Sequence, residues 1–170
     1  ASYGTVTRTV TNIPYFFQEG ITWTVISSGS TAFRRFYSGH LFSNSGQSIV
    51  PDDKSANLDY LIAMLNSVVS KHLLSVMTPT LGFESGYLKI LPILVNEDHL
   101  EEVESLSCQC IQQSKTDWDS FETSWDFKHH PMINNQHATT TTQTSQISDN
   151  YSTWKSITLA RFAQLKANEE

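Results

Sequence analysis

The sequence feature that most constrains the fold is a set of apolar residues at three- and four-residue steps between residues 58 and 76. These residues are Leu58, Leu61, Ile62, Leu65, Val68, Val69, Leu73 and Val76. Such spacing places side chains on one face of an α-helix. Asn57 is suited to cap the start, and Thr78-Pro79 ends the pattern, because proline lacks an amide hydrogen and restricts the residue before it. One long amphipathic helix is therefore predicted from about Leu58 to Met77.

The first fifty residues carry the signals of short antiparallel strands. Runs rich in Thr, Val, Ile, Phe and Tyr alternate with glycines at spacings near ten. The predicted strands are Thr5 to Val10, Ile21 to Ile26, Phe33 to Tyr37 and Ser48 to Val50. A further short strand or loop is expected from Tyr87 to Leu94.

The second half of the sequence is predicted to be mainly helical. Residues 97 to 114 combine one apolar side with many carboxylates, which we expect to be solvated. In the following stretch, Asp117 to Phe127, aromatic residues alternate with acids. We expect Trp118, Phe121 and Trp125 to be buried while the carboxylates stay in water.

The fold class predicted from these patterns is α+β. Residues 1–96 form a strand-rich core with one long helix, and residues 97–136 form an acidic helical and aromatic segment that packs on it. Residues 137–150 include four consecutive threonines and are expected to form a flexible loop. The final helix, 151–170, stops without a cap and is expected to be the start of a longer helix.

Composition narrows the class of protein further. Hydrophobic residues make up 39% and charged residues 16% of the chain, a balance that excludes wholesale disorder. No apolar run approaches the roughly 20 residues that a membrane-spanning helix needs, so we expect a soluble, cytoplasmic protein with no membrane partner. Cys108 and Cys110 are poorly spaced for a disulfide and match no zinc pattern with His129, His130 or His137, so no metal site is expected.

The net charge of −6 argues at first against a nucleic-acid partner, but its distribution weakens that objection. Residues 1–96 contain six basic and five acidic side chains and are nearly neutral. Residues 97–130 contain nine carboxylates and only Lys115 and Lys128, a net charge of −7. The acidity therefore belongs to one segment.

Several stretches together resemble a known family. They are Phe17-Gln-Glu-Gly-Ile-Thr-Trp-Thr-Val-Ile-Ser-Ser28, Tyr60-Leu-Ile-Ala-Met-Leu-Asn-Ser67, Ile90-Leu-Pro-Ile93, Ser114-Lys-Thr-Asp-Trp-Asp-Ser-Phe-Glu-Thr-Ser-Trp-Asp-Phe127 and Leu165-Lys-Ala-Asn-Glu-Glu170. They are similar to the C-terminal half of the PglX-type adenine-specific DNA methyltransferases of bacteriophage-exclusion (BREX) defence systems. The resemblance covers most of the chain except residues 129–150.

This resemblance implies a two-lobed parent enzyme. One lobe binds S-adenosylmethionine and methylates the exocyclic amine of adenine, and the other reads the DNA sequence. The chain matches only the second, so we expect it to be a target-recognition domain that binds double-stranded DNA and pairs with the catalytic lobe of its parent. Asn12-Ile-Pro-Tyr-Phe16 superficially resembles the family's Asn-Pro-Pro-Tyr motif. Since Ile13 replaces the first proline and no glycine turn precedes it, no catalytic residue and no cofactor are expected in this segment.

Candidate DNA-binding residues are those whose side chains can form hydrogen bonds or ion pairs with bases or phosphates. The first group surrounds the middle of the strand region: Thr22, Trp23, Thr24, Ser27, Ser28, Arg34 and Arg35. The second lies on a probable loop: Asn44, Gln47 and Lys54. The competing interpretation of the first group is a polar hairpin with Trp23 in the core and a solvated arginine pair.

A second function from another class remains open. The acidic segment of residues 97–130 suits a protein-interaction module that docks another protein of the defence system. The rings of Trp118, Phe121 and Trp125 are interpreted as structural, because neighbouring carboxylates would repel phosphate.

Overall fold

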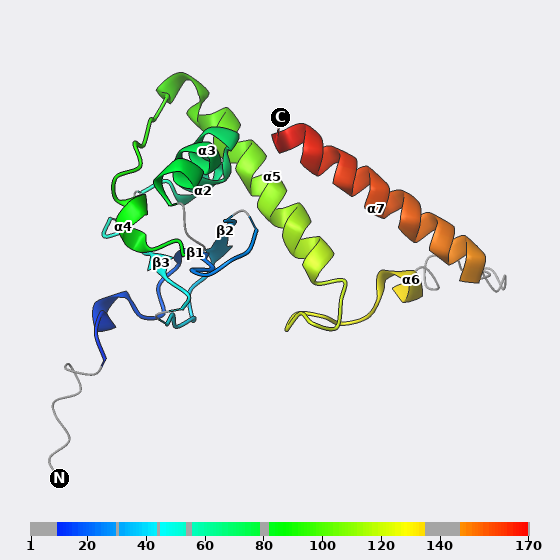
Figure 1. Ribbon diagram of the computed structural model, residues 1–170. Coiled ribbons are helices and arrows are strands. Elements are labelled where there is room, and N and C mark those ends of the chain that lie inside the picture. Colours follow the sequence, from blue (N-terminus) through cyan, green and yellow to red (C-terminus); the bar gives the residue numbers. More distant parts are fainter. Residues whose placement is uncertain are drawn as a thin grey trace, which may run out of the picture. The chain divides into compact units, whose positions relative to one another are not determined.

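The computed structural model describes residues 10–29, 31–43, 45–53, 56–78, 82–134 and 147–169 (Figure 1). Three strands and several helices make the protein mixed, so the α+β class is confirmed. The chain divides into two units, Ala1–Glu104 and Ser105–Glu170.

The first unit is built on a three-stranded antiparallel sheet in the order β2-β1-β3. The strands are β1 (Gly20–Trp23), β2 (Phe33–Phe36) and β3 (Ser48–Ile49). Three of the predicted strands are confirmed in shorter form. Residues 5–9 of the fourth lie outside the described residues, and Val10 lies in a bend.

The register of the sheet separates its two faces. Trp23 lies opposite Phe33, and Ile21 lies opposite both Arg35 and Ile49, so these side chains share one face. Thr22 lies opposite Arg34 and Ser48, which places all three on the other face.

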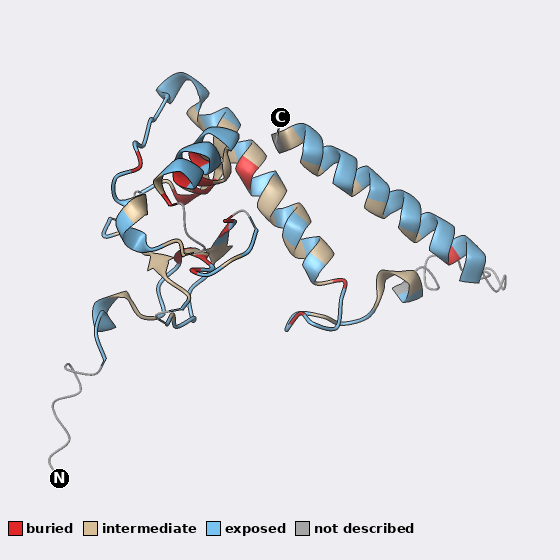
Figure 2. Ribbon diagram, in the orientation of Figure 1, coloured by how far each residue is buried: buried red, intermediate tan, exposed pale blue. Residues whose placement is uncertain are grey.

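The core of the first unit lies between the sheet and helix α2 (Leu58–Asn66). Figure 2 shows the buried residues gathered on these elements. The buried side chains include Ile21, Trp23, Phe33, Leu58, Ile62 and Leu65. The indole N–H of Trp23 donates to the Phe83 carbonyl at 2.8 Å, so its one polar group is satisfied.

Gly20 is required by a close approach of neighbouring atoms. A Cβ at this position would overlap the carbonyl oxygen of Ile49 and come within 2.9 Å of the Phe36 ring. The Phe36 ring therefore lies against the start of β1, which a larger residue would displace.

The long helix predicted from Leu58 to Met77 is wrong in one respect: it is two helices, α2 and α3 (Val68–Met77), bent by 64° at Ser67. Asn66 explains the break. Its amide nitrogen donates to the Phe33 carbonyl at 2.9 Å, and its side-chain oxygen accepts from the Phe33 amide at 3.0 Å. Ser67 is extended and its hydroxyl caps α3 by accepting from the Ser70 amide.

The bend exposes part of the predicted apolar face. Val68, Val69 and Val76 are 80%, 68% and 70% exposed, although the spacing placed them with the core residues of α2. The predicted cap is confirmed, since the Asn57 side chain accepts from the Tyr60 amide. The helix ends at Met77, as expected before Thr78-Pro79.

Short helical turns complete the first unit. η1 (Ile13–Tyr15) contains the Asn-Ile-Pro-Tyr stretch, where a hydrogen bond to Asp52 raises the pKa of Tyr15. α4 (Ser85–Leu88) and η2 (Glu97–His99) follow later in the chain. The strand or loop expected from Tyr87 to Leu94 is the end of α4 followed by irregular backbone.

The second unit is helical. The predicted helix at 97–114 is confirmed as α5 (Leu100–Trp118), which begins in the first unit and extends four residues further than expected. α6 (Pro131–Asn134) and α7 (Ile147–Glu169) follow. Residues 147–150, assigned to a loop by composition, are the first turn of α7.

Contacts within the second unit join α5 to α7. Arg161 donates to the Asp117 carboxylate at 3.3 Å, and Asn168 donates to the Gln109 side chain at 3.4 Å. The rings of His130 and Trp154 lie 5.4 Å apart between centroids.

Two of the expectations concern membrane-spanning helices and metal-binding sites. No single helix in the described residues is long and apolar enough to cross a membrane. Judged by length and composition alone, α2 and α3 taken together as a bent pair are long and apolar enough. No group of three or more His, Cys, Asp or Glu side chains in the described ranges is placed to hold a metal ion.

Candidate DNA-contact surface

The predicted DNA-binding residues of the sheet divide between its two faces. Thr22 and Arg34 lie on the face away from the buried residues, whereas Trp23 and Arg35 lie on the face that carries the core. We call the first of these the open face, defined by Thr22, Thr24 and Arg34.

The open face presents hydroxyl and guanidinium groups. Arg34 and Thr24 are exposed, and the Arg34 guanidinium donates to the Thr24 hydroxyl at 3.5 Å, a long hydrogen bond. The Thr22 hydroxyl donates to the Gln47 carbonyl at 2.8 Å, which ties β1 to the segment before β3. The five donors of an arginine exceed this single contact, so Arg34 retains N–H groups for an external acceptor.

Arg35 is used differently from its neighbour. Its side chain is only 13% exposed, and its two terminal nitrogens pair with Glu19 at 2.9 Å and with Asp59 at 3.1 Å. These ion pairs connect β2 to α2 and to the residues before β1. The structure thus assigns Arg35 to internal cohesion, in place of the solvated arginine pair of the competing interpretation.

Trp23 also belongs to the interior. The side chain is 2% exposed and lies 5.8 Å from the Phe33 ring, in the core position that the competing interpretation gave it. Its side chain lies on the core face of the sheet, opposite the open face, and offers no surface to a ligand.

The turn after β1 is held at its base and exposed at its tip. The Phe83 amide donates to the Val25 carbonyl at 2.7 Å, and Ile26 bridges Gly82. Ser28 is exposed, while the half-buried Ser27 accepts from the Gly29 amide at 3.2 Å.

Of the predicted loop residues, Gln47 is the one that lies in the described part of the chain. Gln47 donates to Glu84 and accepts from the Ser85 amide, both at 2.8 Å, so its amide group holds the start of α4. Asn44 and Lys54 lie outside the described residues. Contacts of all these residues with DNA therefore stay predictions, and Thr24, Ser28 and Arg34 are the exposed members among the described residues.

In the turn after α5, the burial of the aromatic side chains is the opposite of that expected from the sequence. Trp118 is 57% exposed, Phe121 44% exposed and Trp125 fully exposed, so the prediction that these rings are buried is wrong. The ring-bearing turn, residues 118–127, is named the aromatic turn below.

The carboxylates of this segment are instead engaged by neighbouring side chains. Lys115 donates to Asp119 and to Asp126, each at 2.6 Å, and the Ser124 hydroxyl donates to the other oxygen of Asp119 at 2.6 Å. The hydrogen bond to Asp119, reinforced by Asp126, raises the pKa of Lys115 well above its usual value. The same contact with Lys115, followed by that with Ser124, lowers the pKa of Asp119. Alternation of acids with aromatics could not reveal that Lys115 lies where it gathers two acids at once.

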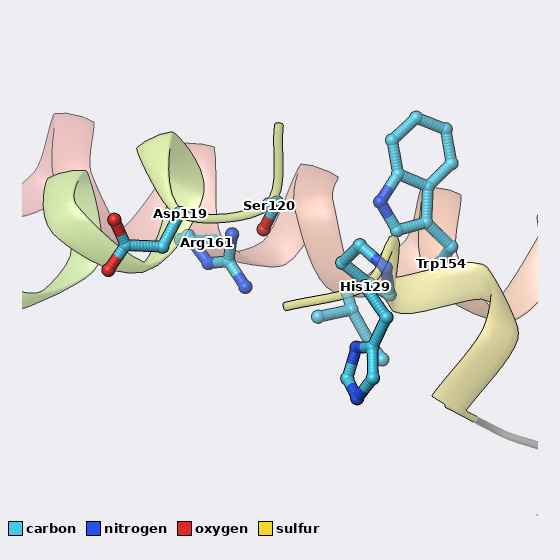
Figure 3. Close-up of a pocket in the computed structure, with 7 residues that line it drawn as sticks. Asp119, Ser120, His129, Trp154 and Arg161 are labelled. Atoms are coloured by element: carbon cyan, nitrogen blue, oxygen red, sulfur yellow. The ribbon is translucent and has the colours of Figure 1, made fainter. Parts of the chain in front are cut away.

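One cavity lies within the second unit, with a volume of about 230 Å³. It is lined by Asp119, Ser120, His129, Pro131, Trp154, Ile157 and Arg161. In Figure 3, Asp119 and Arg161 lie toward one end and Trp154 toward the other. The cavity falls below the roughly 300–1,000 Å³ of usual ligand sites, and its charged groups already pair within the protein. It is therefore not assigned as a cofactor site.

The chain is similar in sequence to known proteins. No protein-family model matches it. The adenine-specific methyltransferase PglX of Lacticaseibacillus casei (strain Zhang) is 35% identical over 162 residues, which cover 94% of this chain and 13% of that protein. The adenine-specific methyltransferase BrxX of Escherichia coli O9:H4 (strain HS) is 35% identical over 123 residues, 72% of this chain and 10% of that protein. The chain thus spans about one eighth or less of the length of these relatives, and the resemblance predicted from its motifs is confirmed.

Proposed function

The chain is a relative of one segment of the PglX-type adenine-specific methyltransferases, and we propose that it is the target-recognition segment of such an enzyme, reading the sequence of duplex DNA. The open face is the observation that carries this proposal. Arg34 and Thr24 are presented to solvent there, on a sheet held rigid from its other side by α2. A rigid sheet that displays a guanidinium and hydroxyls offers the donors that phosphate oxygens and base edges accept.

The parent enzyme supplies the remaining parts of the reaction. We propose that it binds S-adenosylmethionine in a catalytic lobe of the same polypeptide and methylates adenine within a phage-defence system in the cytoplasm. Methylation requires the adenine to leave the duplex, and a recognition segment holds the DNA while the base is extruded. Arg34 serves this step by fixing a phosphate or by forking onto a guanine edge.

Charge distribution supports residues 1–96, which contain the sheet, as the DNA-binding part. Residues 1–96 carry six basic and five acidic side chains, whereas residues 97–130 carry a net charge of −7. Because DNA binding draws on neutralisation of phosphates, the nearly neutral residues 1–96 are the better DNA partner. The acidic segment suits a second role, docking of a protein partner, which the exposed rings of the aromatic turn favour.

A titration of the chain with duplex DNA tests the proposal. We expect saturable binding at about 50 mM salt that weakens steeply toward about 200 mM, because counterions are released from each neutralised phosphate. Arg34→Ala should lower the slope of log affinity against log salt by about one if Arg34 contacts phosphate.

Lys71→Ala is the matched control for this titration. Lys71 is an exposed cation on α3, outside the sheet, so its removal changes the charge equally but spares the open face. Equal losses of DNA affinity in the two variants would mean that Arg34 contributes only its charge and makes no specific contact with DNA. Failure of any duplex to bind at low salt would contradict the proposal and favour protein docking.

A further inference from the structure

The two units bury different kinds of residue. Among the described residues, every buried apolar side chain belongs to the first unit. The buried residues of the second unit are polar, namely Ser107, Ser120, Ser124 and Asn150. Figure 2 shows α7 exposed along most of its length. The second unit therefore has little apolar core of its own, while it displays three large rings to solvent.

The aromatic turn is fixed by its own hydrogen bonds. Backbone amides of Ser120, Phe121 and Ser124 donate to the carbonyls of Asp117, Trp118 and Phe121 at 3.0–3.2 Å. Lys115 draws Asp119 and Asp126 together beneath the turn, and Arg161 holds Asp117. A surface organised in this way loses little conformational entropy when it binds.

We propose that the aromatic turn is a docking surface for another part of the parent methyltransferase, an apolar protein patch rimmed by lysine or arginine. This inference rests on the proposed function, which makes the chain one segment of a longer enzyme. Aromatic side chains are enriched at the centres of protein interfaces, and tryptophan is among the residues that contribute most to binding there. Trp118, Phe121 and Trp125 expose such side chains within one turn.

Charge and chain length identify the occupant. Asp126 is 68% exposed beside Trp125, and Glu122 is exposed beside Phe121, so the rim of the surface is acidic. An acidic rim repels phosphate and attracts lysine and arginine, which favours a protein over DNA. The match to this chain covers only 13% of the PglX relative. In a parent enzyme of that kind, most of the polypeptide lies outside the matched segment and can provide the patch.

Hydroxyl-radical footprinting of the DNA-free, full-length methyltransferase tests this docking surface. Oxidation of Trp118, Phe121 and Trp125 should be fast in the 170-residue chain and several-fold slower in the full-length enzyme. Trp23, which is 2% exposed, is the internal control and should be protected in both proteins.

Three results would overturn the inference. Rapid oxidation of the three rings in the full-length enzyme would show that the surface is uncovered. Protection already present in the 170-residue chain would show that this chain covers its own rings. Protection that appears only after duplex DNA is added would make the turn a DNA-stacking surface. Because the readout needs no DNA, failure here is distinguishable from failure of Arg34 to contact DNA.

A double variant provides an independent check. Trp118→Ala with Trp125→Ala should leave the unfolding midpoint of the 170-residue chain nearly unchanged, since both rings are exposed there. The same pair of changes should lower the unfolding midpoint of the full-length enzyme, where the rings are docked. Equal behaviour in the two proteins would contradict the inference.

Discussion

Trp23 in the first unit is buried and Trp125 in the second unit is exposed, and this contrast shows what decides whether a tryptophan of this protein is buried. In the first unit Trp23 is 2% exposed, because α2 closes over the sheet and the Phe83 carbonyl accepts its N–H. In the second unit Trp125 is fully exposed, because ion pairs to Lys115 fix the turn while no buried apolar side chain of the described part of that unit packs on it. Burial thus follows from whether a facing element exists, since the residue type is the same.

The largest effect is expected from removing the two rings in turn. Trp23→Ala should destabilise the first unit by about 3–5 kcal/mol, as truncation of large core aromatics does. Trp125→Ala should change the free energy of unfolding by no more than about 0.5 kcal/mol, because exposed substitutions rarely do more. Urea unfolding of both variants measures the difference, and similar losses would break the comparison between the units.

A second prediction concerns the bend between α2 and α3. Asn66→Ala should cost about 1–3 kcal/mol, because the Phe33 amide and carbonyl on β2 both lose their partner. Asn57→Ala, which removes only the cap of α2, should cost about 1 kcal/mol. The order of the two urea midpoints checks the result, and a larger loss for Asn57→Ala would contradict the role given to Asn66.

The adjacent arginines should separate stability from recognition. Arg35→Ala should lower stability by about 1–2 kcal/mol, since it breaks two ion pairs of a largely buried side chain and removes its packing. Arg34→Ala should lower it by less than about 0.5 kcal/mol, because the side chain is exposed. Thermal unfolding measures both, and an equal loss would mean that the open face is part of the cohesion of the unit.

The smallest effect is the pH response of the aromatic turn. The lowered pKa of Asp119 means that its contribution is present above the unfolded value of 3.8 and is lost as the pH falls through the folded value. The raised pKa of Lys115 means that its contribution is present below 10.5 and is lost as the pH rises through the folded value. The indole NMR signal of Trp125 should therefore be constant from about pH 5 to about pH 10 and shift at more acidic pH. A titration of this signal near neutral pH would contradict the ion-pair account.

The sequence predicted elements better than it predicted their surroundings. The strands around Trp23 and Phe33 and the cap at Asn57 follow from local propensity and turn chemistry, and the structure confirms them. The bend at Ser67 depends on a contact between Asn66 and a strand 33 residues away. Apolar periodicity reports only neighbours within a few turns, so it could not anticipate this contact.

In the candidate site too, features set by neighbouring residues could be predicted from the sequence, whereas contacts made only by folding could not. Adjacent arginines in a strand must point to opposite faces, which the alternation of β-structure requires. Which of the two meets carboxylates depends on Glu19 and Asp59, and these are brought near Arg35 only by folding. In the aromatic turn, spacing showed rings among acids but not that Lys115 and Arg161 would engage the acids.

The most direct test of the central claim is the methylation of genomic DNA by the full-length parent carrying Arg34→Ala, with Lys71→Ala as the charge-matched control. The open face should make Arg34→Ala reduce the methylation rate or relax the choice of site, by about 1–3 kcal/mol of discrimination if the arginine reads a guanine. Lys71→Ala should leave both unchanged. A folded Arg34→Ala enzyme with unaltered rate and unaltered sites would contradict DNA recognition by the open face.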